Sequence, residues 1–154
     1  MRQNIFDPSV KEDILGRINK LTPASGPIWG KLSSSQMIRH LAEACKLGIN
    51  EVYVPDQSNL VTRSLVKWLF LRNVKPPGRE KGNIKTFPEI DIVALGIIVN
   101  DIQQEKENYQ AVLDRLTNTK ELNKKHPLFG KMSRDDWGYL TYAHADYHLT
   151  QFNV

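Results

Sequence analysis

The chain has 154 residues, 40% of them hydrophobic, and a formal net charge of +4. This length suits one compact domain, residues 1–154, and the single cysteine excludes an internal disulfide framework. The start of the chain lacks the basic and apolar regions of a secretory signal, and no apolar run is long enough to span a bilayer, so we expect a cytoplasmic protein without membrane association.

The positive charge is concentrated in the segment from Arg63 to Lys85. Seven basic residues against one acidic residue give this basic segment a charge of +6, so the rest of the chain carries −2. Such a cluster can attract an anionic ligand, or it can be the solvated face of a helix and the following loop. No helix-turn-helix, zinc-finger or Arg/Gly pattern accompanies it, so we do not expect nucleic acid as the partner.

Caps and hydrophobic periodicity predict five helices. Ser33 and Gln36 have the spacing of a capping box ahead of the second helix, and Ser133 precedes the last one. The Pro and Gly residues that follow Arg72 prevent regular structure over a long connection. The β-branched stretch 90–99 is predicted to be a short strand or an extended strap. The predicted helices, in chain order, are 8–21, 34 to about 50, 60–72, 102–116 and 134–151.

Five amphipathic helices in so short a chain must bury their apolar stripes against one another. We therefore expect an all-α fold, a four-helix bundle with an additional short helix and a long crossover loop.

Cys45 lies on the apolar side of the second predicted helix, beside Ala44 and Leu41. This position predicts a buried, unreactive thiol.

The positions of three histidines predict a metal site. His144 and His148 are one turn apart on the last predicted helix and point the same way, on a stripe that also contains Trp137 and Leu140. His40 has a comparable inward position on the second helix, so it could complete a facial triad. Three neutral imidazoles leave the ion's charge uncancelled and one coordination position open, which is typical of catalytic zinc sites.

A metal site is not the only interpretation of this spacing. Two histidines one turn apart on an apolar helix face can be hydrogen-bonded core residues, and His40 can be a core residue as well.

Three stretches resemble the DinB/YfiT-like metalloenzyme superfamily, and especially a family of uncharacterised function within it. Together they span most of the chain. The first is Trp29, Gly30, Lys31, Leu32, Ser33, Gln36, Met37 and His40; the second is His126, Pro127, Leu128, Phe129 and Gly130; the third is Trp137, Gly138, His144, His148, Gln151 and Phe152.

The resemblance implies a four-helix bundle of the DinB/YfiT-like type with a histidine triad at one end of the core. Its metal ligands would be His40, His144 and His148, with zinc expected and nickel, iron or manganese as alternatives. Relatives often have a further histidine where this chain has Tyr147, which is not on the ligand stripe. The superfamily includes thiol-dependent transferases and isomerases, so a low-molecular-weight thiol is a second candidate cofactor.

Two classes of function remain open. The first is a metal-dependent enzyme acting on a small molecule, either a thiol-dependent transferase or a hydrolase. The second is a noncatalytic binding protein that uses the basic segment 63–85. The sequence leaves a homodimer open.

A catalytic base would have to come from a carboxylate near the histidines. Glu43, three residues after His40, is the best candidate by helix geometry, although a solvated carboxylate fits the same position. Asp146 should point away from the ion, because it lies about 200° around the helix from each of its histidine neighbours. His126 precedes Pro127 in a connection, and we expect it to be a surface or hinge residue.

Overall fold

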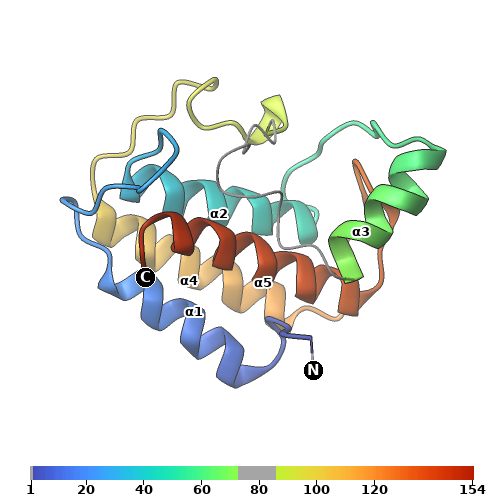
Figure 1. Ribbon diagram of the computed structural model, residues 1–154, viewed down its shortest axis with the longest axis horizontal. Helices are drawn as coiled ribbons and strands as arrows, with labels where there is room; N and C mark the ends of the chain where they lie inside the picture. Colours follow the sequence, from blue (N-terminus) through green and yellow to red (C-terminus); the bar gives the residue numbers. More distant parts are fainter. Residues whose placement is uncertain (1, 73–85) are drawn as a thin grey trace.

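The computed structural model describes residues 2–72 and 86–154, and five α-helices make up about half of this part of the chain (Figure 1). The described residues also contain one small antiparallel hairpin, β1–β2, with two residues in each strand. The helices are α1 (Pro8–Lys20), α2 (Ser34–Gly48), α3 (Lys67–Arg72), α4 (Ile102–Asn118) and α5 (Arg134–Gln151), and the strands are β1 (Lys125–His126) and β2 (Gly130–Lys131).

Side-chain caps determine where the two histidine-bearing helices begin. In α2 the Ser33 side chain accepts from the backbone N–H of Gln36, whose side chain in turn accepts from the backbone N–H of Ser33. Ser133 and Asp136 form the same capping box at the start of α5. Each box satisfies backbone donors that a helix start leaves free. The rotational position of the later side chains on both helices therefore follows from these caps.

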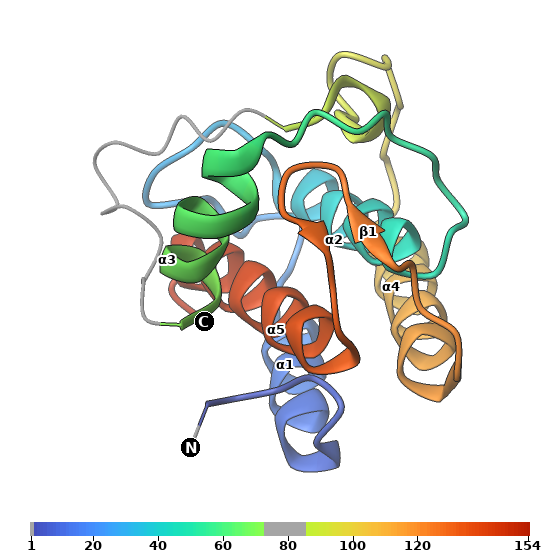
Figure 2. The ribbon, with the colours of Figure 1, turned by 90° about the vertical axis from the view of Figure 1, so that its right-hand side faces the viewer.

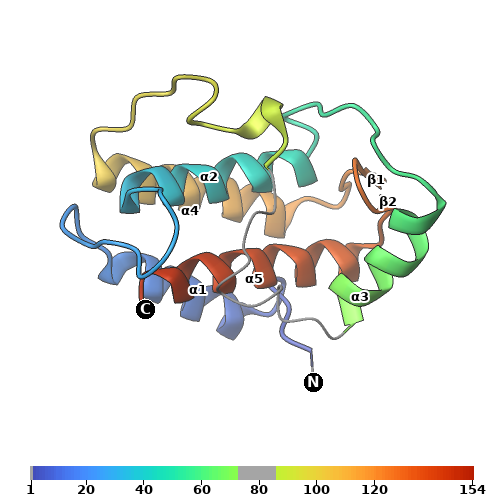
Figure 3. The same cartoon turned by 45° about the horizontal axis from the view of Figure 1, so that its top comes forward.

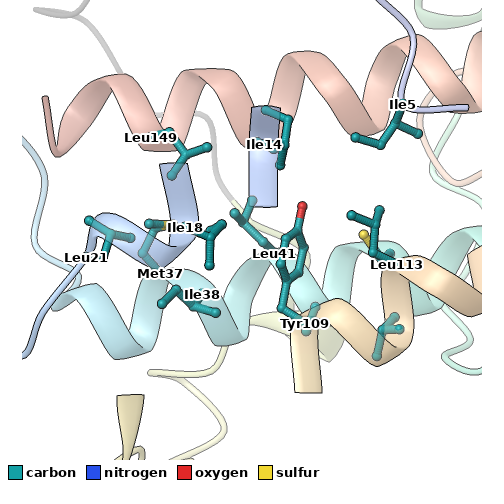
Figure 4. Packing of buried hydrophobic residues seen from close by; sticks show 14 of the residues in the cluster. Ile5, Ile14, Ile18, Leu21, Met37, Ile38, Leu41, Tyr109, Leu113 and Leu149 are labelled. Carbon is teal, nitrogen blue, oxygen red and sulfur yellow. The ribbon is translucent and has the colours of Figure 1, made fainter. Parts of the chain in front are cut away.

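The four long helices form two pairs, α2 beside α4 and α1 beside α5, with the apolar core between them (Figure 3). Residues from all four helices meet in this core, and the Tyr109 side chain from α4 points into it (Figure 4). Cys45 is buried in the same cluster, and burial raises the pKa of its thiol to about 12, as expected for an unreactive cysteine. The largest fully buried side chains are Ile5, Ile14, Ile18, Leu21, Met37, Ile38, Leu41, Ile92, Tyr109, Leu113, Leu116 and Leu149.

A second apolar cluster lies at the other end of α2 and α5. It contains Trp137 from α5 and Phe129 from the hairpin, with Leu71 from the end of α3. Gly48 lets α4 and α5 approach the end of α2, because a Cβ atom there would lie 2.9 Å from Leu116 Cδ1 and 3.4 Å from Trp137 Cε3.

The structure agrees with the predicted all-helical class and differs in three local features. The third predicted helix contains a π-helical segment, η1 (Thr62–Val66), before α3. The stretch 90–99 forms the end of a 3-10 turn, η2 (Pro88–Ile90), followed by turns and irregular chain, so the strand alternative is wrong. The sequence analysis did not predict the β1–β2 hairpin. None of the described helices is long and apolar enough to cross a membrane.

Candidate metal centre

Three histidines from two helices meet across the core. His40 comes from α2, and His144 and His148 come from successive turns of α5. The Nε2 atom of His144 lies 3.0 Å from Nε2 of His40 and 3.1 Å from Nε2 of His148. The ring centroids are 4.8 to 4.9 Å apart, with steeply inclined planes. Within residues 2–72 and 86–154 these three form the group of His, Cys, Asp and Glu side chains that could hold an ion.

The protein environment keeps the three rings neutral. Burial lowers the pKa of His40 to about 4, against the opposing effect of the negative charge of Asp91. Burial also lowers the pKa of His148 to about 3, and that of His144 well below its usual value. His144 and His148 keep a small accessible edge, yet the surrounding protein still disfavours their charged forms. Neutral imidazoles have the lone pairs that a metal ligand needs.

Gln151 fixes the orientation of one of these rings. Its Oε1 lies 2.6 Å from Nδ1 of His148, so the neutral ring donates its N–H to the glutamine and presents the Nε2 lone pair to the cluster. Gln151 is itself buried, and its backbone oxygen accepts from the N–H of Ile28. A second polar residue behind a ligating histidine is the usual support of a protein metal site.

One bound cation could satisfy all three nitrogens, whereas hydrogen bonds among the three rings cannot. The Nε2 atom of His148 has no hydrogen, because the hydrogen of this ring is on Nδ1. If His40 Nε2 donates a hydrogen bond to His144 Nε2, then the lone pairs of His144 Nε2 and His148 Nε2 face each other without a hydrogen between them. A hydrogen on His144 Nε2 cannot be aligned with both of its neighbours. A tetrahedral ion with Zn–N bonds of about 2.0–2.1 Å separates its ligand nitrogens by about 3.4 Å, close to the separations observed.

The structure places Glu43 in an ion-pair network. Its Oε1 accepts from Arg39 Nε at 2.9 Å and from Lys46 Nζ at 2.8 Å. The side chain is buried, and it does not belong to the histidine cluster. Asp146 pairs with Arg17 at 2.8 Å, on the side of α5 that faces α1. The carboxylate whose charge acts on His40 is instead Asp91, which directly follows η2.

His126 does not have the position that we expected for it. We expected a surface or hinge residue, but only 8% of its area is exposed, because the hairpin folds it against Phe129, Phe87 and Trp137. Sequence reasoning also gave Gln151 no role at the site. Its spacing of three residues from His148 was the available signal, since residues three apart are neighbours on a helix.

Most of the basic segment 63–85 falls on residues 73–85, which lie outside the described part of the chain. Of its described members, Arg63 pairs with Asp56 at 3.1 Å and Lys67 pairs with Asp136 at 3.2 Å. The expected position of this charge relative to the histidines therefore stays a prediction.

Comparison with known proteins gives one family. No curated protein and no solved structure matches the chain. A family model described as a protein of unknown function (DUF1569) matches residues 10–154, which include all four histidines and every helix after the first turn of α1. The chain therefore belongs to the DUF1569 family.

Proposed function

We propose that His40, His144 and His148 bind one divalent metal ion and that the protein is a metal-dependent enzyme acting on a small molecule. The observation that carries the proposal is the convergence of three Nε2 atoms, with separations of 3.0 and 3.1 Å across the core. Because the pKa of each ring is lowered, the three imidazoles are uncharged at neutral pH, and each can bind a cation through its unprotonated nitrogen without first losing a charge.

Zinc is the ion that we expect, with nickel, iron and manganese as alternatives that accept imidazole ligands. Three uncharged ligands preserve the full charge of the ion and leave a coordination position for another molecule. When bound, the ion would supply Lewis-acid chemistry there, lowering the pKa of a thiol or a water molecule.

The reaction that we favour is a thiol-dependent transfer to a small electrophilic molecule. The resemblance to the DinB/YfiT-like superfamily supports this choice, and two helix pairs with a histidine cluster between α2 and α5 fit a bundle of that type. The alternatives are a metal-dependent hydrolase, which would use the same open position for water, and a noncatalytic binding protein, favoured by the +6 charge of the basic segment 63–85.

Two side chains of this chain would assist the ion. Gln151 would hold His148 in its ligating orientation through the 2.6 Å contact to Nδ1. Glu43 is our candidate for the base, and its carboxylate would have to give up contacts with Arg39 and Lys46 in order to accept a proton from a substrate.

Elemental analysis of protein purified without a nickel column tests the metal site. We expect one divalent ion per chain in the wild type and none in His144→Ala. His126→Asn is the matched control, since it removes a buried histidine that is not part of the cluster, and we expect it to retain the ion. Wild-type protein that binds no ion after incubation with zinc, nickel, iron or manganese would refute the proposal.

Cobalt substitution separates the thiol reaction from the hydrolytic one. Cobalt adopts the geometry of zinc sites and gives a visible spectrum that changes with its ligands. We expect 2-mercaptoethanol to bind the cobalt-loaded protein and to produce a thiolate-to-metal absorption band. A spectrum that stays unchanged at saturating thiol would exclude the thiol reaction and favour the hydrolase.

A further inference from the structure

His126 is a buried histidine with one nitrogen committed to the backbone. Its Nδ1 accepts from the backbone N–H of Leu128 at 3.1 Å and of Phe129 at 3.3 Å. A neutral imidazole has a single hydrogen, so when Nδ1 accepts, the hydrogen is on Nε2. The turn between β1 and β2 therefore fixes His126 in the form that donates from Nε2.

Aromatic side chains enclose this ring. Phe129 stacks on it with a centroid distance of 4.6 Å, and the rings of Trp137 and Phe87 lie at 5.5 and 5.9 Å. Among the hydrogen bonds of residues 2–72 and 86–154, those of the His126 ring are made by Nδ1, and no oxygen accepts from Nε2. Nε2 is not one of the polar atoms that are fully buried without a partner, so its hydrogen is available to a water molecule or a ligand.

The ring lies close enough to the three-histidine cluster for its charge to act on His144. Trp137, which contacts His126, is about two turns before His144 on the same face of α5. Phe87, the other aromatic neighbour, leads through η2 to Asp91, whose charge acts on His40. A charge on His126 would also act on His144. Figure 2 shows the hairpin at the end of α2 and the start of α5. His126 and the cluster are therefore parts of one region.

We propose that His126 is a substrate-binding residue of this region, and that its Nε2–H donates a hydrogen bond to an oxygen acceptor on the molecule that binds at the three-histidine centre. The acceptor would be a carbonyl or carboxylate oxygen, and the apolar part of the same molecule would lie along α5 toward the aromatic rings. This inference rests on the proposed function, because it places the other end of the molecule at the ion.

The environment suits a neutral donor. Burial, together with the nearby charge of Lys67, lowers the pKa of His126 to about 4. The ring therefore donates a hydrogen bond at neutral pH without carrying a charge, and it would position the acceptor instead of transferring a proton to it.

A series of linear dicarboxylates from malonate to suberate tests the proposal on cobalt-loaded protein, with acetate as the reference probe. One carboxylate can bind the ion, and only a chain of sufficient length lets the second reach His126. We expect one length to bind more tightly than acetate, as measured by titration of the visible spectrum. His126→Asn should remove about tenfold of that advantage and leave acetate binding unchanged, since the variant lacks the donor that would reach the second carboxylate.

The asparagine variant is chosen because its side-chain oxygen can still accept from the two backbone N–H groups of the turn, as in an Asx turn, while it lacks the distant donor. If the role of His126 is only structural, His126→Asn binds every dicarboxylate as the wild type does, and the proposal is overturned. The proposal is also overturned if wild-type protein binds no dicarboxylate more tightly than it binds acetate. Wild-type protein that binds no cobalt contradicts the proposed function instead, so the two failures are distinguishable.

A measurement on wild-type protein covers the case in which His126→Asn does not fold. Long-range ¹H–¹⁵N spectra report which nitrogen of a neutral histidine has the hydrogen. We expect it on Nε2 of His126, with a resonance that shifts when the preferred dicarboxylate is added to zinc-loaded protein. A hydrogen on Nδ1, or a resonance that the dicarboxylate leaves unchanged, contradicts the proposal.

Discussion

Gln151 accepts a short hydrogen bond from His148, with 2.6 Å between Oε1 and Nδ1. The contact joins two residues of α5 that lie one turn apart, and both are held by the packing of the C-terminal helix. Gln151 thus selects which nitrogen of His148 points to the cluster.

Replacing Gln151 with Leu should weaken metal binding by about 10- to 100-fold, the usual effect of removing the residue behind a ligating histidine. His148 would then be free to change its tautomer and its ring orientation. Competition with a chromogenic zinc chelator measures the affinity. Gln151→Glu is the matched control, because it keeps an acceptor at the same position and should bind at least as well as the wild type. Equal affinity in Gln151→Leu and the wild type would mean that the contact has no role in the site.

Replacing His144 with Ala should remove the ion and leave the fold in place. The apolar cores contain most of the buried area, so the helices can form without a metal ion. Far-ultraviolet circular dichroism should be close to that of the wild type. Zinc should raise the melting temperature of the wild type, since a ligand that binds only the folded state stabilises it, and should not change that of His144→Ala. If zinc raises the melting temperature of His144→Ala, the variant still has a zinc site, and this result would contradict the assigned ligands.

Replacing Glu43 with Gln distinguishes a base from a structural carboxylate. If Glu43 is the base, the variant should retain the ion and lose about a hundredfold or more in metal-dependent turnover. If its role is confined to the contacts with Arg39 and Lys46, turnover is unchanged and only stability falls, by about 1 kcal/mol, because an uncharged oxygen accepts these hydrogen bonds less strongly. Urea denaturation alongside the activity assay separates the two outcomes.

Stability of the metal-free protein should depend on pH through the buried histidines. The pKa of His40 is lowered to about 4 and that of His148 to about 3, whereas an unfolded imidazole has a pKa of about 6.5. As the pH falls below about 6.5, the unfolded chain binds protons that the folded chain does not, so the free energy of unfolding decreases until the folded pKa values are reached. Urea titrations in the presence of a chelator measure this. His148→Ala should show a shallower decrease, and a wild-type stability that is constant down to about pH 4 would contradict the assigned neutral rings.

Two glycines in helices should respond to alanine in opposite ways. In Gly48→Ala the new Cβ would lie 2.9 Å from Leu116 Cδ1, and overpacking of this kind costs about 1–3 kcal/mol. No atom lies within 4 Å of the corresponding position at Gly16, in α1, so Gly16→Ala should gain up to about 1 kcal/mol from helix propensity. Thermal melts of both variants test the packing of α2 against α4 and α5. A stabilised Gly48→Ala would show that this end of α2 is less closely packed than described.

Capping residues and hydrophobic spacing predicted the four long helices well, because each of these helices begins at a side-chain cap. Asp7, Ser33, Asp101 and Ser133 cap four of the five helices through their side chains. The spacing of His144 and His148 likewise predicted that their rings share a helix face. That His40 meets them depends on how α2 packs across the core on α5, which a helical period does not determine.

Features that depend on tertiary packing were missed for the same reason. The hairpin that buries His126 has only two residues in each strand, too few for an alternating pattern to appear in the sequence. The charge of Asp91 acts on His40 because an irregular connection packs against α2, and no periodicity describes such a segment. The contact of Gln151 could have been anticipated from helix spacing, but no pattern in the sequence favoured it over the other neighbours of His148.

The two capping boxes also limit how the length of the chain can vary. An inserted or deleted residue turns every later side chain of a helix by about 100°, so a change between Ser33 and His40, or between Ser133 and His144, would rotate a ring away from the other two. The same change in the connection from α2 to α4, or from α4 to the hairpin, is absorbed before the next cap. Family members that keep the triad should therefore differ in length in these connections and conserve the distance from each serine to its histidine.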